Sequence, residues 1–150
     1  MTITECNLLD RRTMTQNSPA DVLEERLVQF AIAIVTLLGQ LPQNFQAKHV
    51  ATQVLRSGTA AAPNYGEARA AESRADFIHK LKIALKELNE TAVWLRIIQG
   101  SFAVETDFLT RLIAENTELC KILVTSIQTA RRNNKANADL NGPFAKRINH

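Results

Sequence analysis

Apolar residues recur at steps of three and four along the chain, and this spacing predicts amphipathic helices. The first stretch carries such a seam at Leu23, Leu27, Phe30, Ile34, Leu37 and Leu41. A second stripe, formed by Val28, Ala31, Val35 and Leu38, is expected to widen the buried face of the same helix. Such a wide face is typical of a helix in a bundle rather than in a two-stranded coiled coil.

Start and stop signals bound this first helix. Ser18 is the expected N-cap, Pro19 takes the first helical position, and Asp21 follows the cap by three residues. These residues suit a helix start because their side chains satisfy the free amides of the first turn. Gly39 and Pro42 then end the helix.

The second helix is predicted from about residue 44 to about residue 71. Its buried face is expected to consist of Ala47, Val50, Val54, Gly58, Ala61 and Tyr65. The small residues of 58–62 let a neighbouring helix approach closely. Pro63 removes one backbone hydrogen bond, so we expect one helix with a kink rather than two helices.

Two further helices complete the pattern. Ser73 and Asp76 cap the third, which carries Phe77, Leu81, Leu85, Leu88, Ala92, Leu95 and Ile98 and ends at Gly100. The fourth is predicted from about Thr106 to Arg132, with Leu109, Leu112, Asn116, Leu119, Leu123, Ile127 and Ala130 along one side. Short connections make neighbours antiparallel. The expected fold is an all-α, antiparallel up-down four-helix bundle over residues 18–132, with flexible tails at 1–17 and 133–150.

Composition supports one helical domain. The 150 residues are 45% hydrophobic, which is enough for one core, and only 5% are aromatic. No run reaches the roughly 20 apolar residues that a bilayer span needs. Because residues 1–17 lack the apolar segment of a secretory signal, the expected location is the cytoplasm, with no membrane partner.

The net charge of +3 raises the question of nucleic-acid binding, which depends on where the charge lies. Residues 18–130 carry 11 Lys and Arg against 12 Asp and Glu, whereas residues 131–150 carry 5 against 1. The candidates for phosphate contact are therefore Arg131, Arg132, Lys135, Lys146 and Arg147 in the C-terminal segment. Weaker candidates are Arg69, Arg74, Lys82 and Lys86, which are interspersed with acidic residues.

Five polar residues of the second and third helices form a candidate cluster: Arg56, Asn64, Glu67, Glu87 and Glu90. One interpretation is a carboxylate metal site between facing helices, but such sites use Glu-x-x-His pairs, which this chain lacks. The favoured interpretation is a structural polar network between helices, with no metal and no cofactor.

The sequence offers no catalytic apparatus. Ser57 has no local histidine, and Cys6 and Cys120 lack the basic setting that activates a thiolate. No glycine-rich phosphate loop is present. We therefore predict that the protein is not an enzyme.

The run from Leu55 to Leu95 resembles the signature of the four helix bundle protein family, also called the 23S rRNA intervening-sequence proteins. The most specific matches are Arg56-Ser57, Asn64-x-x-Glu67-Ala68, Asp76-Phe77 and Lys86-Glu87-x-x-Glu90-Thr91 with Trp94-Leu95. The resemblance covers roughly residues 23–130. It implies a four-helix bundle that assembles as a homopentameric ring.

A related branch, the accessory variability proteins of diversity-generating retroelements, binds a reverse transcriptase and nucleic acid. The resemblance therefore implies an oligomeric accessory protein that binds RNA or DNA, or a ribonucleoprotein or reverse-transcriptase partner. The alternative is an interaction scaffold that binds only protein. A metal-dependent enzyme is the third and least favoured hypothesis.

Overall fold

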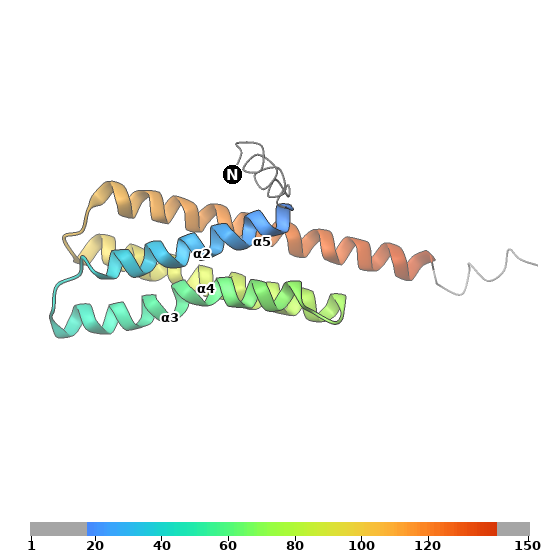
Figure 1. The fold of residues 1–150 in the computed structure, drawn as a ribbon, viewed down its shortest axis with the longest axis horizontal. Coiled ribbons are helices and arrows are strands. Elements are labelled where there is room, and N and C mark those ends of the chain that lie inside the picture. Colours follow the sequence, from blue (N-terminus) through green and yellow to red (C-terminus); the bar gives the residue numbers. More distant parts are fainter. Residues whose placement is uncertain (1–17, 141–150) are drawn as a thin grey trace, which may run out of the picture.

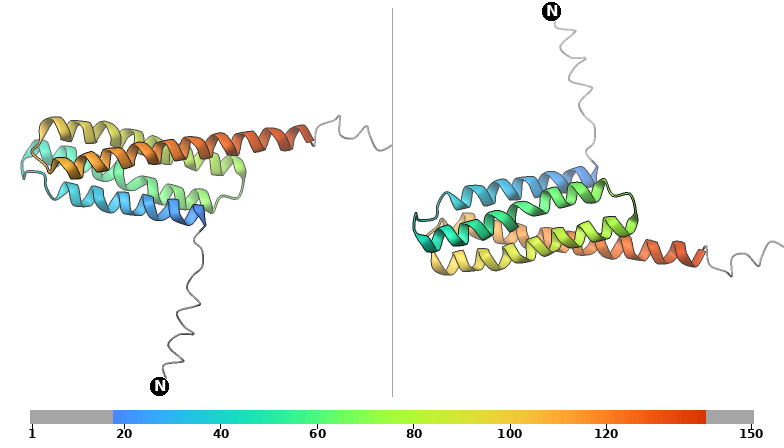
Figure 2. Two further views of the ribbon diagram at one scale, coloured as in Figure 1. Left: turned by 90° about the horizontal axis from the view of Figure 1, so that it is seen from above. Right: turned by 90° about the horizontal axis from the view of Figure 1, so that it is seen from below.

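The computed structural model describes residues 18–140, with side chains described as far as residue 133. It contains four helices: α2 (Pro19–Leu38), α3 (Phe45–Arg69), α4 (Arg74–Ser101) and α5 (Thr106–Leu140). Consecutive helices pack side by side, and α5 returns to pack on α2 (Figures 1 and 2). The predicted all-α, antiparallel up-down four-helix bundle is confirmed.

Side-chain caps fix where the first three helices begin. The Ser18 hydroxyl accepts a hydrogen bond from the Asp21 amide at 3.2 Å, and the Asp21 carboxylate accepts one from the Ser18 amide at 2.9 Å. The Ser18 hydroxyl also donates to Oδ2 of Asp21 at 2.7 Å, and this bond, with those from Arg69 and the Ser18 amide, lowers the pKa of Asp21 to about 2. Asn44 and Ser73 cap α3 and α4 by accepting from the amides three residues later. These N-cap residues satisfy free amides of the first turn and so fix the residue at which each of the three helices begins.

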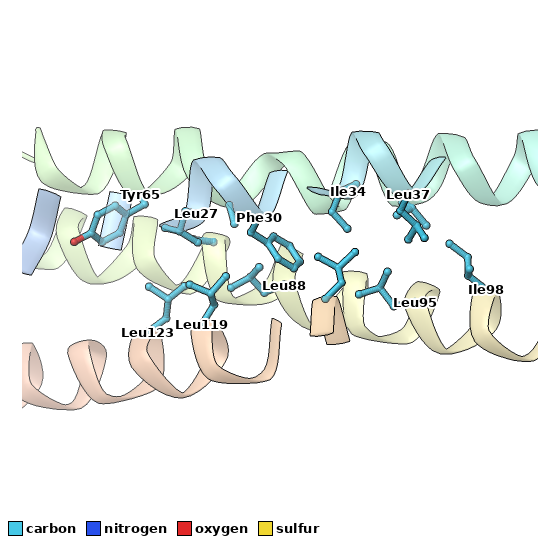
Figure 3. Close-up of a cluster of buried hydrophobic side chains, with 14 of the residues drawn as sticks. Leu27, Phe30, Ile34, Leu37, Tyr65, Leu88, Leu95, Ile98, Leu119 and Leu123 are labelled. Atoms are coloured by element: carbon cyan, nitrogen blue, oxygen red, sulfur yellow. The ribbon is translucent and has the colours of Figure 1, made fainter. Parts of the chain in front are cut away.

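The core is built from one apolar seam on each helix. The whole predicted seam from Leu23 to Leu41 is buried, with Leu41 lying just after the end of α2, and on α3 the whole predicted face from Ala47 to Tyr65 is buried. Figure 3 shows side chains of all four helices, among them Phe30, Leu88 and Leu119, meeting in the space between the ribbons. Burial of these seams is the main stabilising contribution to the fold.

The prediction that a second stripe widens the buried face of α2 is wrong for two of its four members, Val28 and Val35. Val28 and Val35 are 38% and 55% exposed, and Ala31 and Leu38 are only partly buried. Ile32 lies between them and is 52% exposed. The reason is geometric, because residues 28, 32 and 35 project from the side of the helix opposite to the seam at 27, 30 and 34.

The buried seam of α4 is rotated from the predicted one. It runs through Leu81, Ala84, Leu88, Thr91, Leu95 and Ile98. The predicted members Phe77, Leu85 and Ala92 are only partly buried. Thr91 is polar and Ala84 is small, so neither residue stands out in an apolar pattern, although their spacing fits it.

The fourth helix is longer than predicted. It continues past Arg132 to Leu140, so residues 133–140 belong to α5 rather than to a tail. Asparagine disfavours a helix by only a fraction of a kcal/mol per residue, and the strong stop signal in the sequence is Gly142-Pro143. As a result, the end of α5 extends beyond the other three helices (Figure 1).

The close approach of α2 and α3 depends on Gly58. This residue is buried, and a Cβ atom placed on it would lie 2.9 Å from Cγ1 and 3.0 Å from Cγ2 of Ile34. Ile34 is itself fully buried in the core. The expected role of the small residues of α3 is therefore confirmed at this position. The expectation of one helix through Pro63 is also confirmed.

We predict that Gly58→Ala lowers the free energy of unfolding by about 1–2 kcal/mol. Alanine gains about 1 kcal/mol of helix propensity, but its methyl group would lie only 2.9 Å from Ile34, so its overpacking cost is expected in the upper part of the usual range, roughly 2–3 kcal/mol. The measurement is urea unfolding followed by circular dichroism. Gly100→Ala is the control, because no atom lies within 4 Å of the added methyl group. A Gly58→Ala protein as stable as the parent would contradict this packing.

Candidate functional site

Three polar side chains are buried among residues 18–133: Ser57, Thr91 and Asn116. The Thr91 hydroxyl lies 3.0 Å from Oγ of Ser57 and 2.8 Å from the carbonyl oxygen of Glu87. The Asn116 amide donates to the carbonyl oxygen of Leu88 at 3.1 Å. The middle of α4 is therefore tied by polar contacts to α3 on one side and to α5 on the other.

An ionic group lies directly outside the Ser57–Thr91 contact. The guanidinium of Arg56 pairs with Oε1 of Glu90 and lies 3.4 Å from Oε2 of Glu87. The Trp94 indole also donates to Oε1 of Glu90, at 3.4 Å. The hydrogen bond from Arg56 lowers the pKa of Glu90 and raises the pKa of Arg56 itself. We call Arg56, Ser57, Glu87, Glu90 and Thr91 the α3–α4 clamp.

The structure brings together only part of the predicted polar cluster. Arg56, Glu87 and Glu90 meet, whereas Asn64 donates to the Ala60 carbonyl of its own helix at 2.8 Å. Glu67 pairs instead with Lys80, whose Nζ is 2.5 Å from its carboxylate. The separation follows from antiparallel packing, since residues further along α3 meet earlier residues of α4.

Sequence reasoning missed Thr91 as part of this group. The signal that reveals it is the register of antiparallel helices, in which the two residue numbers of a contacting pair add to a nearly constant value: 146 for Arg56 with Glu90 and 148 for Ser57 with Thr91. Thr91 also falls on the three-and-four repeat of the buried seam. Its polarity hid it from a search for apolar positions.

No three side chains of histidine, cysteine, aspartate or glutamate converge as a metal site among the described residues. The carboxylates of Glu87 and Glu90 are instead directed at the Arg56 guanidinium. Within residues 18–140, no helix is long and apolar enough to cross a bilayer.

The predicted nucleic-acid contacts fall into three groups. Arg69 is engaged by two acids of α2, Asp21 at 2.6 Å and Glu24. The side chains of Arg74, Lys82, Lys86, Arg131 and Arg132 are exposed and make no ion pair within the described residues. Lys135 belongs to the last part of α5, and Lys146 and Arg147 lie outside the described residues. Five exposed cations are therefore available for phosphate contact.

Arg69 and Arg74 also line a surface hollow of about 720 Å³ between the α3–α4 turn and α5. Its walls are mixed, since Glu72, Phe77 and Thr129 contribute alongside the arginines. The mixed charge gives this hollow no clear preference for an anion.

A different feature stands out on the opposite side of the bundle. Val28, Ile32 and Val35 of α2 are exposed, and Leu55 of α3 is 44% exposed beside a groove that it shares with Leu38. We call Val28, Ile32, Val35, Leu38 and Leu55 the outer apolar face. Leu38 also packs against the core, whereas Val28, Ile32 and Val35 project from the side of α2 opposite to its buried seam.

Arg56→Gln is expected to lower the melting temperature at pH 7, because Glu87 and Glu90 would then share a site without their cation. The pKa of Glu90 is depressed in the folded state, so its contribution is present above the unfolded pKa and is lost as the pH falls through the folded value. The difference from the parent should therefore shrink towards pH 3. Arg96→Gln, an exposed position of α4, is the control. A pH-independent difference would argue against the ion pair.

Comparison with known proteins places this geometry in a family. Residues 23–125, which contain the whole clamp, match the family model of the 23S rRNA-intervening sequence protein. The chain is also similar to a solved protein of unknown function from the S23 ribosomal protein family of Bacteroides thetaiotaomicron, at 37% identity and a TM-score of 0.67. That match covers 73% of this chain and 97% of the other. The comparison with curated proteins gives no match. The chain belongs to the 23S rRNA-intervening sequence protein family.

Proposed function

We propose that the chain is a non-enzymatic accessory protein that assembles with copies of itself, as a homopentamer, and that the assembly binds RNA or a ribonucleoprotein. The observation that carries this proposal is the outer apolar face. A complete core lies on one side of α2, yet three branched apolar side chains stand exposed on the other.

Self-assembly is supported by the cost of leaving this face in water. Burying an aliphatic side chain of this size contributes about 1.5–3 kcal/mol. Val28, Ile32 and Val35 repeat at helical spacing, so one partner surface can cover all three together. Contiguous apolar patches of this kind mark interaction sites on otherwise soluble bundles.

Nucleic-acid binding is supported by the position of the free cations. Lys82 and Lys86 are exposed on α4, which lies diagonally across the bundle from α2 (Figure 2). Arg131 and Arg132 are exposed on α5. Assembly through α2 and α3 leaves these cations accessible, and the number of phosphate contacts then multiplies with the number of subunits. The family description, which refers to 23S rRNA, makes RNA the first candidate.

The double variant Ile32→Glu with Val35→Glu is expected to sediment as a 16.7 kDa monomer, because it places two charges in the proposed interface. Both side chains are exposed in the single bundle, so the helical circular dichroism should be retained. Val93→Glu on α4, where the valine is 53% exposed, is the matched control. If the double variant keeps the mass of the parent assembly, the outer apolar face is not the interface.

Lys82→Gln with Lys86→Gln is expected to weaken binding to a structured fragment of 23S rRNA in fluorescence anisotropy at low salt. Loss of two phosphate contacts per subunit should reduce the slope of log affinity against log salt by about 2 for each subunit that contacts the RNA. Removing residues 131–150 should weaken binding further. Lys121→Gln is the control, because Glu118 already compensates that charge at 2.7 Å. If the parent protein fails to bind RNA at low salt, the RNA part of the proposal is wrong.

The second candidate is a scaffold that binds only protein. It is favoured by the near balance of charge over residues 18–130, with 11 basic and 12 acidic side chains. This candidate predicts that a protein partner captured by the full chain stays bound after nuclease treatment. Loss of the partner on nuclease treatment would favour the ribonucleoprotein candidate.

A further inference from the structure

The surface hollow of about 720 Å³ beside the α3–α4 turn has two walls of different chemistry. One wall consists of the turn and the start of α4, with Glu72, Arg74 and Phe77, and the other is a stretch of α5 that includes Thr125 and Ser126. Figure 1 shows that α5 continues past the turn, and the hollow lies between the two. Sites for small organic ligands usually have volumes of about 300–1,000 Å³, so this hollow has room for more than a single ion.

The wall at the turn carries one cation and one carboxylate that are not paired. Arg74 and Glu72 are exposed, and neither makes an ion pair among the described residues. Arg69 lines the same hollow, but Asp21 and Glu24 already compensate its charge. The hollow therefore suits a ligand that carries both an anion and a hydrogen-bond donor, rather than an anion alone.

The wall on α5 adds further hydrogen-bond acceptors. The Thr125 hydroxyl donates to the carbonyl oxygen four residues earlier at 3.0 Å, and the Ser126 hydroxyl does the same at 2.9 Å. A hydroxyl group that has donated its one hydrogen offers a ligand only its lone pairs. A ligand between the two walls is therefore expected to present donors to α5 and to Glu72.

Phe77 supplies an aromatic surface to the hollow. It is partly buried, because it packs against the hydrophobic core while it also lines the hollow. Contact with the core holds the ring in place, so the part that faces the hollow is a fixed platform. Unpaired RNA bases stack on such aromatic side chains, and their edges are then read by hydrogen bonds.

We propose that this hollow binds one unpaired nucleotide of an RNA strand, with a base that carries an exocyclic amino group. The base stacks on Phe77, its amino group donates to the Glu72 carboxylate, and a phosphate pairs with Arg74. Cytosine fits this arrangement, because a carboxylate accepts from its N4 amino group. Uracil has a carbonyl oxygen at the same place, which the acceptors of the hollow disfavour. The inference rests on the proposed RNA binding and adds a site and a base preference to it.

Hexacytidylate and hexauridylate RNA test the inference, because they have equal length and charge and differ at the exocyclic group. In fluorescence anisotropy at low salt, we expect the full chain to bind hexacytidylate at least about 5-fold more tightly. Glu72→Gln should abolish this preference, because an amide both donates and accepts. Glu25→Gln, which removes an exposed acid of α2 outside the hollow, is the control and should keep the preference.

Two further variants separate the phosphate contact from the stacking contact. Arg74→Gln should weaken both hexamers alike and reduce the salt slope by about 1 for each hollow occupied. Its control is Lys48→Gln, an exposed cation near the start of α3. Phe77→Leu keeps an apolar side chain against the core but loses the ring, so both hexamers should bind about 5- to 100-fold more weakly while the circular dichroism is retained. Its control is Phe108→Leu, another partly buried phenylalanine of the bundle.

The outcomes distinguish this site from the proposed function. Equal binding of the two hexamers, unchanged in Glu72→Gln and Arg74→Gln, would show that the hollow is not the site, while binding to the 23S rRNA fragment would still stand. A parent chain that binds no RNA would overturn both. Cytidine monophosphate should bind at least about 10-fold more weakly than hexacytidylate, because it lacks the neighbouring phosphates. If it binds as tightly, the ligand is a free nucleotide and the inference of an RNA strand is wrong.

Discussion

A helix in a four-helix bundle can bury only the side that faces the bundle axis, and this constraint governs how the chain uses its apolar residues. The seam of α2 from Leu23 to Leu41 fills that side completely. Any further apolar stripe on the same helix must face solvent or another molecule. Val28, Ile32 and Val35 form such a stripe, so α2 carries one surface for its own bundle and a second, exposed apolar surface that we propose another copy covers.

The conspicuous polar residues of α3 and α4 belong to the inside of this arrangement. Arg56 meets Glu90 at the surface while Ser57 meets Thr91 in the interior, so two adjacent pairs fix the register of the two helices. A register slip would separate both pairs and leave the carboxylates of Glu87 and Glu90 without their cation, whereas the Ser57 and Thr91 hydroxyls would keep their hydrogen bonds to carbonyl oxygens of their own helices. The α3–α4 clamp therefore joins two helices of the same bundle, and the exposed surfaces available to a partner lie elsewhere on the bundle.

Sequence periodicity predicted the number, order and direction of the helices, because each core seam repeats at three and four residues and polar caps mark the helix starts. It predicted one polar network of Arg56, Asn64, Glu67, Glu87 and Glu90, of which the structure brings only Arg56, Glu87 and Glu90 together. Which residues of two antiparallel helices meet depends on the lengths of the turn and the helices, and a pattern within each helix does not contain that information.

The exposure of the second apolar stripe of α2 is another feature that the sequence pattern alone did not predict. A stripe of valine and isoleucine looks the same whether it faces a core or a partner, so its exposure became visible only in the folded bundle. The same holds for the hollow between the α3–α4 turn and α5, since it depends on how complete helices pack. In this chain the partner surfaces thus arise from what the single bundle leaves uncovered.

The most direct test is native mass spectrometry of the unmodified full-length chain across a range of protein concentrations. The account predicts one discrete complex with a mass that is a whole multiple of 16.7 kDa, five-fold in the proposed pentamer. A chain that remains at 16.7 kDa at all concentrations would contradict the claim that the exposed face of α2 is covered by another copy.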